Sequence, residues 1–489
     1  MAAVTCIVSG LLMVVWAEQS TAFLGTAQAW ITNTLGIAYI WAAVGLVVFM
    51  TWLAFSRFGS IKLGAEDDQP DFSTKSWLGM LFTAGVGISL VFWGATEWGF
   101  YIDEPPFGDP AWSAAAIDQA TTYGMFHWGV AAWAMYALPT VAIAYQFYVK
   151  NVPHLRLGIA CRGLFGDDFD ESLGSRVMDA FYIIALVAGV ATSLGLAISL
   201  ITVSLDEIFG IGRSLRIDIT VILGCLALFV ISSFRGLKRG IKTLSDFNMV
   251  LVLGFLAFVL IAGPTLFILA QSTHQLGYMA ENFITMLTWT DAVEDKGFVK
   301  DWTIFYWAWW LAFAPFIGLF VTRISKGRTI RELILGMLIF GSFGSWVFYM
   351  ILGNYAVWLD LNGIVPMAEL IANDAQDVAI VEMMKQLPFK AVSLSVLSVL
   401  CIVFIATSFD SAAMTMAAAA SKTMHPDEDP PRWHRLFWSL TLGAMPIVVL
   451  LADGGAGVLK ALVIIASLPL LVILALMAIS LVKSLKEDE

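Results

Sequence analysis

Long apolar segments recur along the whole chain and constrain its fold more than any other feature. A run of about 20 apolar residues spans the hydrocarbon core of a bilayer as a helix. Of the 489 residues, 59% are hydrophobic and 13% are charged, against about 25% charged in soluble domains. The sequence therefore predicts an all-α integral membrane protein with twelve transmembrane helices. The twelve apolar segments lie at 3–18, 37–56, 77–101, 124–149, 177–205, 217–234, 247–271, 302–322, 333–355, 391–420, 436–452 and 456–482.

Basic residues follow every second apolar segment. Arg235, Lys238 and Arg239 come after the sixth, for example, whereas the intervening loops are rich in acids such as Asp103 and Glu104. Because cytoplasmic loops carry an excess of Lys and Arg, the even-numbered segments are expected to end in the cytoplasm. Both termini are then cytoplasmic.

The eighth apolar segment, 302–322, is rich in aromatic residues and interrupted. It carries four tryptophans, and Pro315 and Gly318 break its apolar run. Proline removes a backbone donor, and a carbonyl freed in lipid needs a partner from protein or a lined cavity. On a helix Tyr306, Trp310 and Phe313 share one face. We therefore expect a broken helix with one aromatic face.

Such a face suits an organic cation. An ammonium or sulfonium without N–H groups donates no hydrogen bonds, but it binds the faces of Trp and Tyr rings. The alternative is a belt of tryptophans at the membrane surface. That alternative explains scattered tryptophans well and the cluster of Trp307, Trp309 and Trp310 poorly.

The third apolar segment, 77–101, is also interrupted, by Gly85 and Gly87. It starts inside and the eighth starts outside, five spans later, as in an inverted repeat with a binding site between broken helices. The whole chain, 1–489, then forms one transmembrane domain. Its predicted parts are two additional N-terminal helices (1–76), a first repeat (77–271), an amphipathic interfacial helix (272–300), a second repeat (301–482) and a short cytoplasmic tail (483–489).

The sequence contains no pattern typical of an enzyme active site. The four cysteines and five histidines show no metal-ligand spacing, and no nucleophile lies beside a base in any segment. The loops are too short for a soluble catalytic domain. We expect neither an enzyme nor a cofactor.

Four motifs resemble those of the betaine/choline/carnitine transporter family. They are 305–310 (Phe-Tyr-Trp-Ala-Trp-Trp) with 314–316 and 323–331, the glycine-rich 79–94, 127–129 (His-Trp-Gly), and 407–411 (Thr-Ser-Phe-Asp-Ser). The resemblance implies a neurotransmitter-transporter-like (LeuT-type) inverted repeat of five plus five helices, preceded by two extra helices. It also implies homotrimers in the bacterial cytoplasmic (inner) membrane, with no nucleic-acid partner.

The resemblance also implies a substrate site. The central aromatic box of the family matches four residues, and four more match its access path. Phe313 departs from the pattern, because many relatives carry tryptophan there. The box residues are Trp128, Trp133, Tyr136 and Trp310, and the path residues are Phe92, Phe305, Trp307 and Trp309.

A sodium site is implied as well. Thr407 and Ser408 match the family's sodium-binding hydroxyl pair, and Thr83 and Val86 match the positions whose backbone carbonyls face it. Phe404 matches a further position of this site. The alternative is that the two hydroxyls bond back to carbonyls of their own helix.

Two positions raise questions about ion coupling. Where sodium-coupled relatives place two threonines for a second ion, this chain has Leu186 and Val190, which offer no side-chain oxygen. Asp410 is an acid inside a membrane segment, which is costly unless paired or hydrated. It is either part of a gate, a proton carrier, or capped by Ser408 or Ser411.

The resemblance thus implies a secondary active transporter that imports a small cationic or zwitterionic quaternary-ammonium or sulfonium compound, such as glycine betaine, choline or dimethylsulfoniopropionate. Sodium is the expected coupling ion, and the protein is expected to work by alternating access. The alternatives are an ion-independent exchanger of the carnitine type and a proton-coupled choline symporter. A channel is a further alternative from another class, and no motif favours it.

Overall fold

The computed structural model describes residues 2–85, 87–235, 242–421, 430–451 and 456–487, and helices make up nearly all of this part of the chain. The span 330–361 consists of three short helices, α13 (Ile330–Leu335), α14 (Ser342–Phe348) and α15 (Asn354–Leu361). The π-helical turns η8 (Gly336–Gly341) and η9 (Tyr349–Gly353) join them. The other long helices are α1 (Ala2–Val15), α2 (Ala17–Phe55), α3 (Thr74–Gly85), α4 (Ile88–Thr96), α5 (Ala114–His127), α6 (Val130–Ala144), α8 (Leu173–Phe209), α9 (Leu215–Arg235), α10 (Lys242–Ala262), α11 (Thr265–Thr288), α12 (Ile304–Ile324), α18 (Lys390–Ala419), α19 (Arg432–Leu451) and α20 (Ala456–Glu487).

All twelve predicted apolar segments fall on these helices. In the described part of the chain, seven helices are long and apolar enough to cross a bilayer, or eight if α10 and α11, bent by 111°, count as one. The all-helical membrane fold is thus confirmed. The count of twelve spans and the inverted repeat stay predictions.

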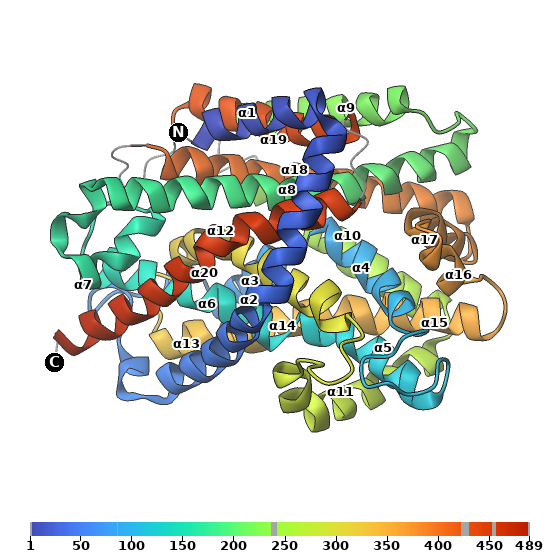
Figure 1. Ribbon diagram of the computed structural model, residues 1–489, viewed down its shortest axis with the longest axis horizontal. Coiled ribbons are helices and arrows are strands. Elements are labelled where there is room, and N and C mark those ends of the chain that lie inside the picture. Colours follow the sequence, from blue (N-terminus) through green and yellow to red (C-terminus); the bar gives the residue numbers. More distant parts are fainter. Residues whose placement is uncertain (1, 86, 236–241, 422–429, 452–455, 488–489) are drawn as a thin grey trace.

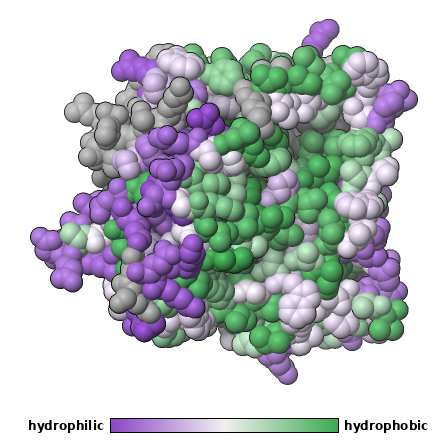
Figure 2. Space-filling model, turned by 60° about the vertical axis from the view of Figure 1, so that its left-hand side comes forward, coloured by the Kyte–Doolittle hydropathy of each residue, from purple (hydrophilic) through white to green (hydrophobic). Residues whose placement is uncertain are grey.

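The helices differ in how deeply they are buried. The spans built around α6 and α12 are 94% and 89% buried, whereas those of α2 and α20 are 39% buried. In Figure 1 α2 and α20 cross each other on the near side, and α8 and α18 run side by side above α12. Figure 2 shows a hydrophobic band between two hydrophilic margins, as expected of a surface that faces lipid. The interior is therefore organised around α6 and α12.

The predicted interruption of the third segment is confirmed. Helix α3 ends at Gly85, and α4 starts at Ile88 after Gly87, whose backbone is extended (φ −120°, ψ 178°). The first N–H groups of a helix have no carbonyl one turn earlier within it, and at the start of α4 the N–H of Leu90 donates to the Gly87 carbonyl at 3.0 Å. Unpaired backbone of this kind is tolerated at membrane depth only next to protein or a cavity.

The predicted break in the eighth segment is wrong. Helix α12 runs without interruption through Pro315 and Gly318. Neighbouring helices accommodate a proline inside a buried membrane helix. Gly318 serves close packing instead, since a Cβ atom there would lie 3.1 Å from the backbone nitrogen of Thr140 in α6.

Two predicted boundaries also need correction. Helix α2 begins at Ala17, so the expected loop between the first two segments is helical. Gly263 and Pro264 end the seventh segment early, and α11 begins at Thr265 rather than at the predicted 272. Apolar side chains of α11 such as Leu266, Leu276 and Ile284 are exposed, in keeping with an amphipathic helix.

We expect Gly318→Val to destabilise the protein by about 1–3 kcal/mol, because the added methyl groups overpack the contact between α12 and α6. Thermal unfolding followed by tryptophan fluorescence measures the effect. Gly45→Val in α2 is the control, because nothing lies within 4 Å of a Cβ atom at that position. Equal melting temperatures of the two variants would contradict the close packing.

Candidate functional site

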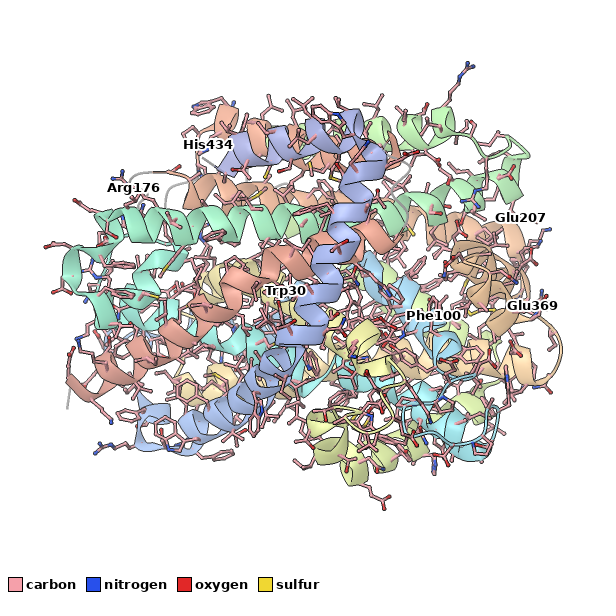
Figure 3. All side chains as sticks on the ribbon, in the orientation of Figure 1. Trp30, Phe100, Arg176, Glu207, Glu369 and His434 are labelled. Atoms are coloured by element: carbon pink, nitrogen blue, oxygen red, sulfur yellow. The ribbon has the colours of Figure 1, made fainter. Side chains whose placement is uncertain are left out.

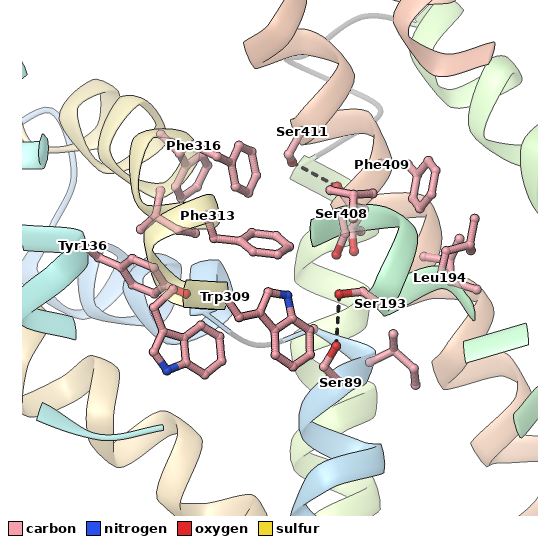
Figure 4. Close-up of a pocket in the computed structure, with 18 of the residues that line it drawn as sticks. Ser89, Tyr136, Ser193, Leu194, Trp309, Phe313, Phe316, Ser408, Phe409 and Ser411 are labelled. Atoms are coloured by element: carbon pink, nitrogen blue, oxygen red, sulfur yellow. Dashed lines mark hydrogen bonds between the residues drawn. The ribbon is translucent and has the colours of Figure 1, made fainter. Parts of the chain in front are cut away.

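A cavity lies where the interrupted helices meet the aromatic face of α12. The space open to the centre of a water molecule is about 150 Å³. Figure 4 shows aromatic rings on one side and serine hydroxyls on the opposite side. The lining residues used below are Ser89, Trp128, Tyr136, Val190, Ser193, Asn248, Trp309, Trp310, Phe313, Phe320, Thr407, Ser408 and Ser411.

Trp310 is the centre of the aromatic wall. Its ring lies 4.5 Å from Trp128, edge to face, and 6.0 Å from Tyr136, and it stacks on Trp309 at 5.4 Å with only 5° between the planes. Rings at several angles around one space can present their negative faces to a cation together. Three predicted box residues therefore share this wall.

A break in the fourth span holds this wall in place. Helix α5 ends at His127 and α6 starts at Val130, so carbonyls near the break lose their helical partners. The indole N–H of Trp310 donates to the His127 carbonyl at 2.8 Å. The indole N–H of Trp346 donates to the Met125 carbonyl, also at 2.8 Å. This break was not predicted from the sequence, although Gly129 marks it.

Several predicted substrate residues do not line the cavity. Trp133 is buried edge-on against Tyr136, with ring centroids 5.5 Å apart, and Trp307 is buried against Phe126 and His127. Phe92 packs on Trp93, and Phe305 lies against Trp309, one layer away from the cavity. These side chains support the wall rather than form it.

Phe313 reaches across the cavity to α8. A Cβ atom at Gly189 would lie 2.6 Å from its ring. The phenylalanine ring therefore packs against the backbone of α8 at Gly189, which has no side chain. Val190 beside it also lines the cavity. Leu186 is fully buried and is not among the lining residues.

Hydroxyl groups form the opposite wall. Thr407 donates to the carbonyls of Val403 and Phe404, at 3.0 Å each, as the alternative interpretation expected. Within the described part of the chain no hydrogen bond occupies the hydroxyl of Ser408, which lines the cavity. Ser89 donates to Ser193 at 3.1 Å beside it.

The hydroxyl of Ser193 was missed in the sequence. It lies on α8 one turn beyond Val190, where no oxygen was expected, and only its position on a buried face marks it. Phe404 is buried behind the wall. Val86 and the side chains of Thr83 and Asp410 lie outside the described residues, so their predicted roles stay predictions.

A buried carboxylate, also missed in the sequence, lies behind the aromatic wall. Glu97, in η2 (Glu97–Phe100), is fully buried. Tyr101 and His127 contact its Oε1 atom at 2.7 and 3.0 Å. Trp128, Tyr306 and Tyr349 contact Oε2 at 3.2, 2.7 and 2.5 Å. An acid inside a predicted membrane segment was the available signal.

These five contacts join η2, α5, α12 and η9 through one side chain. His127 extends this network, because its Nε2 atom lies 3.1 Å from the hydroxyl of Thr303. The bond to the Trp128 indole fixes a ring that lines the cavity. Glu97 is therefore a positioning residue for the box.

The cavity is closed at one end by further aromatic rings. The ring centroid of Trp302 lies 4.8 Å from that of Phe100 and 5.9 Å from that of Trp93, beyond Tyr306. The lining continues the other way, to Phe320 and Asn248. The rings lie toward the start of α12, which is the end predicted to face outside.

Comparison with known proteins agrees with this geometry. The family model described as "BCCT, betaine/carnitine/choline family transporter" matches residues 1–489. This chain belongs to the betaine/carnitine/choline transporter family. It is accordingly a multi-pass membrane transporter and not an enzyme.

Individual relatives match over most of their length. A glycine betaine transporter, OpuD, of Bacillus subtilis is 36% identical over 466 residues, 95% of this chain and 89% of that protein. A carnitine transporter of Acinetobacter baumannii is 32% identical over 476 residues, 97% of this chain and 86% of that protein. A glycine betaine transporter of Acinetobacter baylyi is 34% identical over 460 residues, 94% of this chain and 68% of that protein.

We expect Glu97→Gln to weaken substrate binding about tenfold and to lower the free energy of unfolding by about 1–3 kcal/mol. The glutamine NH₂ cannot accept, so at least one buried donor loses its partner. Calorimetric titration and thermal unfolding measure the two effects. Asp377→Asn is the control, because Asp377 pairs with Arg213 and does not line the cavity. An affinity loss of the same size in this control would argue against a positioning role.

Trp310→Ala should reduce the affinity for glycine betaine about thirtyfold, because a cation–π contact in a desolvated site contributes about 2 kcal/mol. Calorimetric titration of purified protein measures the dissociation constant. Trp30→Ala is the matched control, since Trp30 lies on α2 with 57% of its surface exposed (Figure 3). Similar affinities of the two variants would place the substrate elsewhere.

Proposed function

We propose that this transporter imports a small compound with a quaternary-ammonium or sulfonium head, coupled to sodium and by alternating access. The observation that carries this proposal is the pairing of two walls in one cavity. Trp128, Tyr136 and Trp310 offer rings to an organic cation, and Ser408 and Ser193 offer hard oxygens. Relatives named for glycine betaine and carnitine support a substrate of the same chemical class.

The aromatic wall favours a head group that is only weakly hydrated. A trimethylammonium group gives up little hydration on entering an apolar space and gains the attraction of the rings. A metal cation loses a strongly held water shell and needs oxygen ligands instead. The two cations are thus directed to opposite walls.

The hydroxyl wall supports the proposal of sodium coupling. The Ser408 hydroxyl faces the cavity, and Thr407 places a second oxygen one residue earlier on α18. Helix α3 ends opposite this pair of residues. In transporters of inverted-repeat folds, backbone carbonyls freed at such a helix end complete the sodium sites. An ion-independent exchanger would not need this oxygen-rich surface.

The conformation supports alternating access. Trp302, Phe100 and Trp93 close the end predicted to face outside, while the cavity lining reaches Phe320 towards the predicted cytoplasmic side. We further propose twelve spans with a five-plus-five inverted repeat, both termini in the cytoplasm, and a place in the bacterial inner membrane. Homotrimers would form with the help of the exposed apolar face of α11.

Uptake of labelled glycine betaine into proteoliposomes tests the function. We expect accumulation with an inward sodium gradient and little uptake without it. Uptake that follows a proton gradient alone would indicate the proton-coupled alternative. Exchange that needs only internal substrate would indicate the exchanger.

Thr407→Ala combined with Ser408→Ala should raise the sodium concentration for half-maximal uptake about tenfold, since two hydroxyl oxygens are lost at the proposed site. Ser395→Ala is the control, because its exposed hydroxyl on the same helix donates to the Ala391 carbonyl. The measurement is initial uptake rate against sodium concentration. An unchanged sodium dependence in the double variant would place the ion elsewhere.

A further inference from the structure

Lys460 is a lysine inside a predicted membrane helix and has an unusual environment. It lies near the start of α20, at the same predicted outer end as the start of α12. Its Nζ atom lies 3.8 Å from the centre of the Trp302 ring and 4.9 Å from that of Phe305. The next basic residue along α20 is Lys483, at the opposite end of the helix. The lysine therefore places one positive charge on the aromatic surface.

Within the described part of the chain no acid forms an ion pair with Lys460, although Asp301, Glu97 and Asp374 act on it from longer range. An ionisable side chain at membrane depth is costly and is found mainly where it serves transport. The two rings thus hold the ammonium by cation–π attraction.

The same rings connect Lys460 to the cavity. Phe305 lies 5.4 Å from Trp309, which lines the cavity and stacks on Trp310. Trp302 stacks on Tyr306 at 6.5 Å, and Tyr306 stacks on Trp310 at 5.8 Å. The lysine therefore occupies the outer end of a continuous series of aromatic rings that leads to the box.

We propose that Lys460, Trp302 and Phe305 form an outer selectivity site for zwitterionic substrates. The carboxylate of the substrate pairs with the Lys460 ammonium, and its quaternary head takes the place of that ammonium on the two rings. This inference rests on the proposed function, and it narrows the substrate class from cations and zwitterions to zwitterions.

The physical reason is charge balance at the rings. A zwitterion such as glycine betaine brings an anion for Lys460 together with a cation for the rings, so the displaced ammonium keeps a partner. Choline has the same trimethylammonium head but a hydroxyl in place of the carboxylate. It would add a second positive charge beside Lys460 without compensation, and like charges repel strongly where water is scarce.

The experiment compares KM values for labelled glycine betaine and choline in proteoliposomes. The variants are Lys460→Met, which keeps the length of the side chain and removes the charge, and Lys460→Arg, which keeps the charge. Lys300→Met is the matched control, because Lys300 lies near the same end of α12 but pairs with Asp295 at 2.6 Å. Size-exclusion chromatography checks folding, and Lys460→Gln replaces the Met variant if that variant aggregates.

We expect Lys460→Met to shift the ratio of the two KM values at least about tenfold in favour of choline, the range for losing a charge-assisted contact. The arginine variant and Lys300→Met should keep the parent's preference. A ratio in Lys460→Met that stays within about twofold of the parent's would overturn the inference while leaving the proposed function intact. The same holds if the arginine variant shifts the ratio as strongly as the methionine variant. If the parent transports neither of these compounds nor any other small quaternary-ammonium or sulfonium compound, the proposed function fails and this inference falls with it.

Discussion

The site depends on one constraint, that backbone polar groups inside a membrane must find partners within the protein. The chain is interrupted at two places beside the cavity, between Gly85 and Ile88 and between His127 and Val130. At the second break, the indole N–H of Trp310 satisfies the carbonyl of His127. The hydrogen bond that repairs the helix therefore also orients a ring of the substrate site.

The same need for partners applies to the buried side chain of Glu97. An ionised carboxylate buried in protein needs several donors, because burial otherwise penalises its charge. Here the donors come from four different elements, and three of them are tyrosine hydroxyls. The aromatic residues around the box thus have two physical roles. Their rings face the cavity or the ring series, and their polar ends hold the charge behind it.

Aromatic rings that can bind a cation lie at two levels in this protein. Trp310 and Trp128 form the inner wall of the cavity, and Trp302 already holds the ammonium of Lys460 at the outer end. A ring that binds a cationic side chain of the protein can also bind a substrate cation, provided that the displaced side chain gains another partner. This condition is what makes the carboxylate of a substrate matter in the proposed selectivity.

The sequence by itself determined the helical membrane fold, the interruption of the third span and the aromatic face of α12, because hydrophobicity, glycine placement and helical periodicity are local properties. Family resemblance also assigned Trp128, Tyr136 and Trp310 to a substrate site and Ser408 to a sodium site, and the structure brings all four to one cavity. The predicted helix break at Pro315 was wrong, because the effect of a proline depends on the neighbouring residues that accommodate it.

Only the tertiary structure decided which aromatic residues face the cavity and which support it from behind. Trp307 and Trp309 are two positions apart on one helix, yet one is buried against α5 and the other lines the cavity. The donors around Glu97 and the rings beneath Lys460 come from positions up to hundreds of residues apart. Contacts of this kind depend on how helices pack against each other, and no local pattern in a single sequence carries that information.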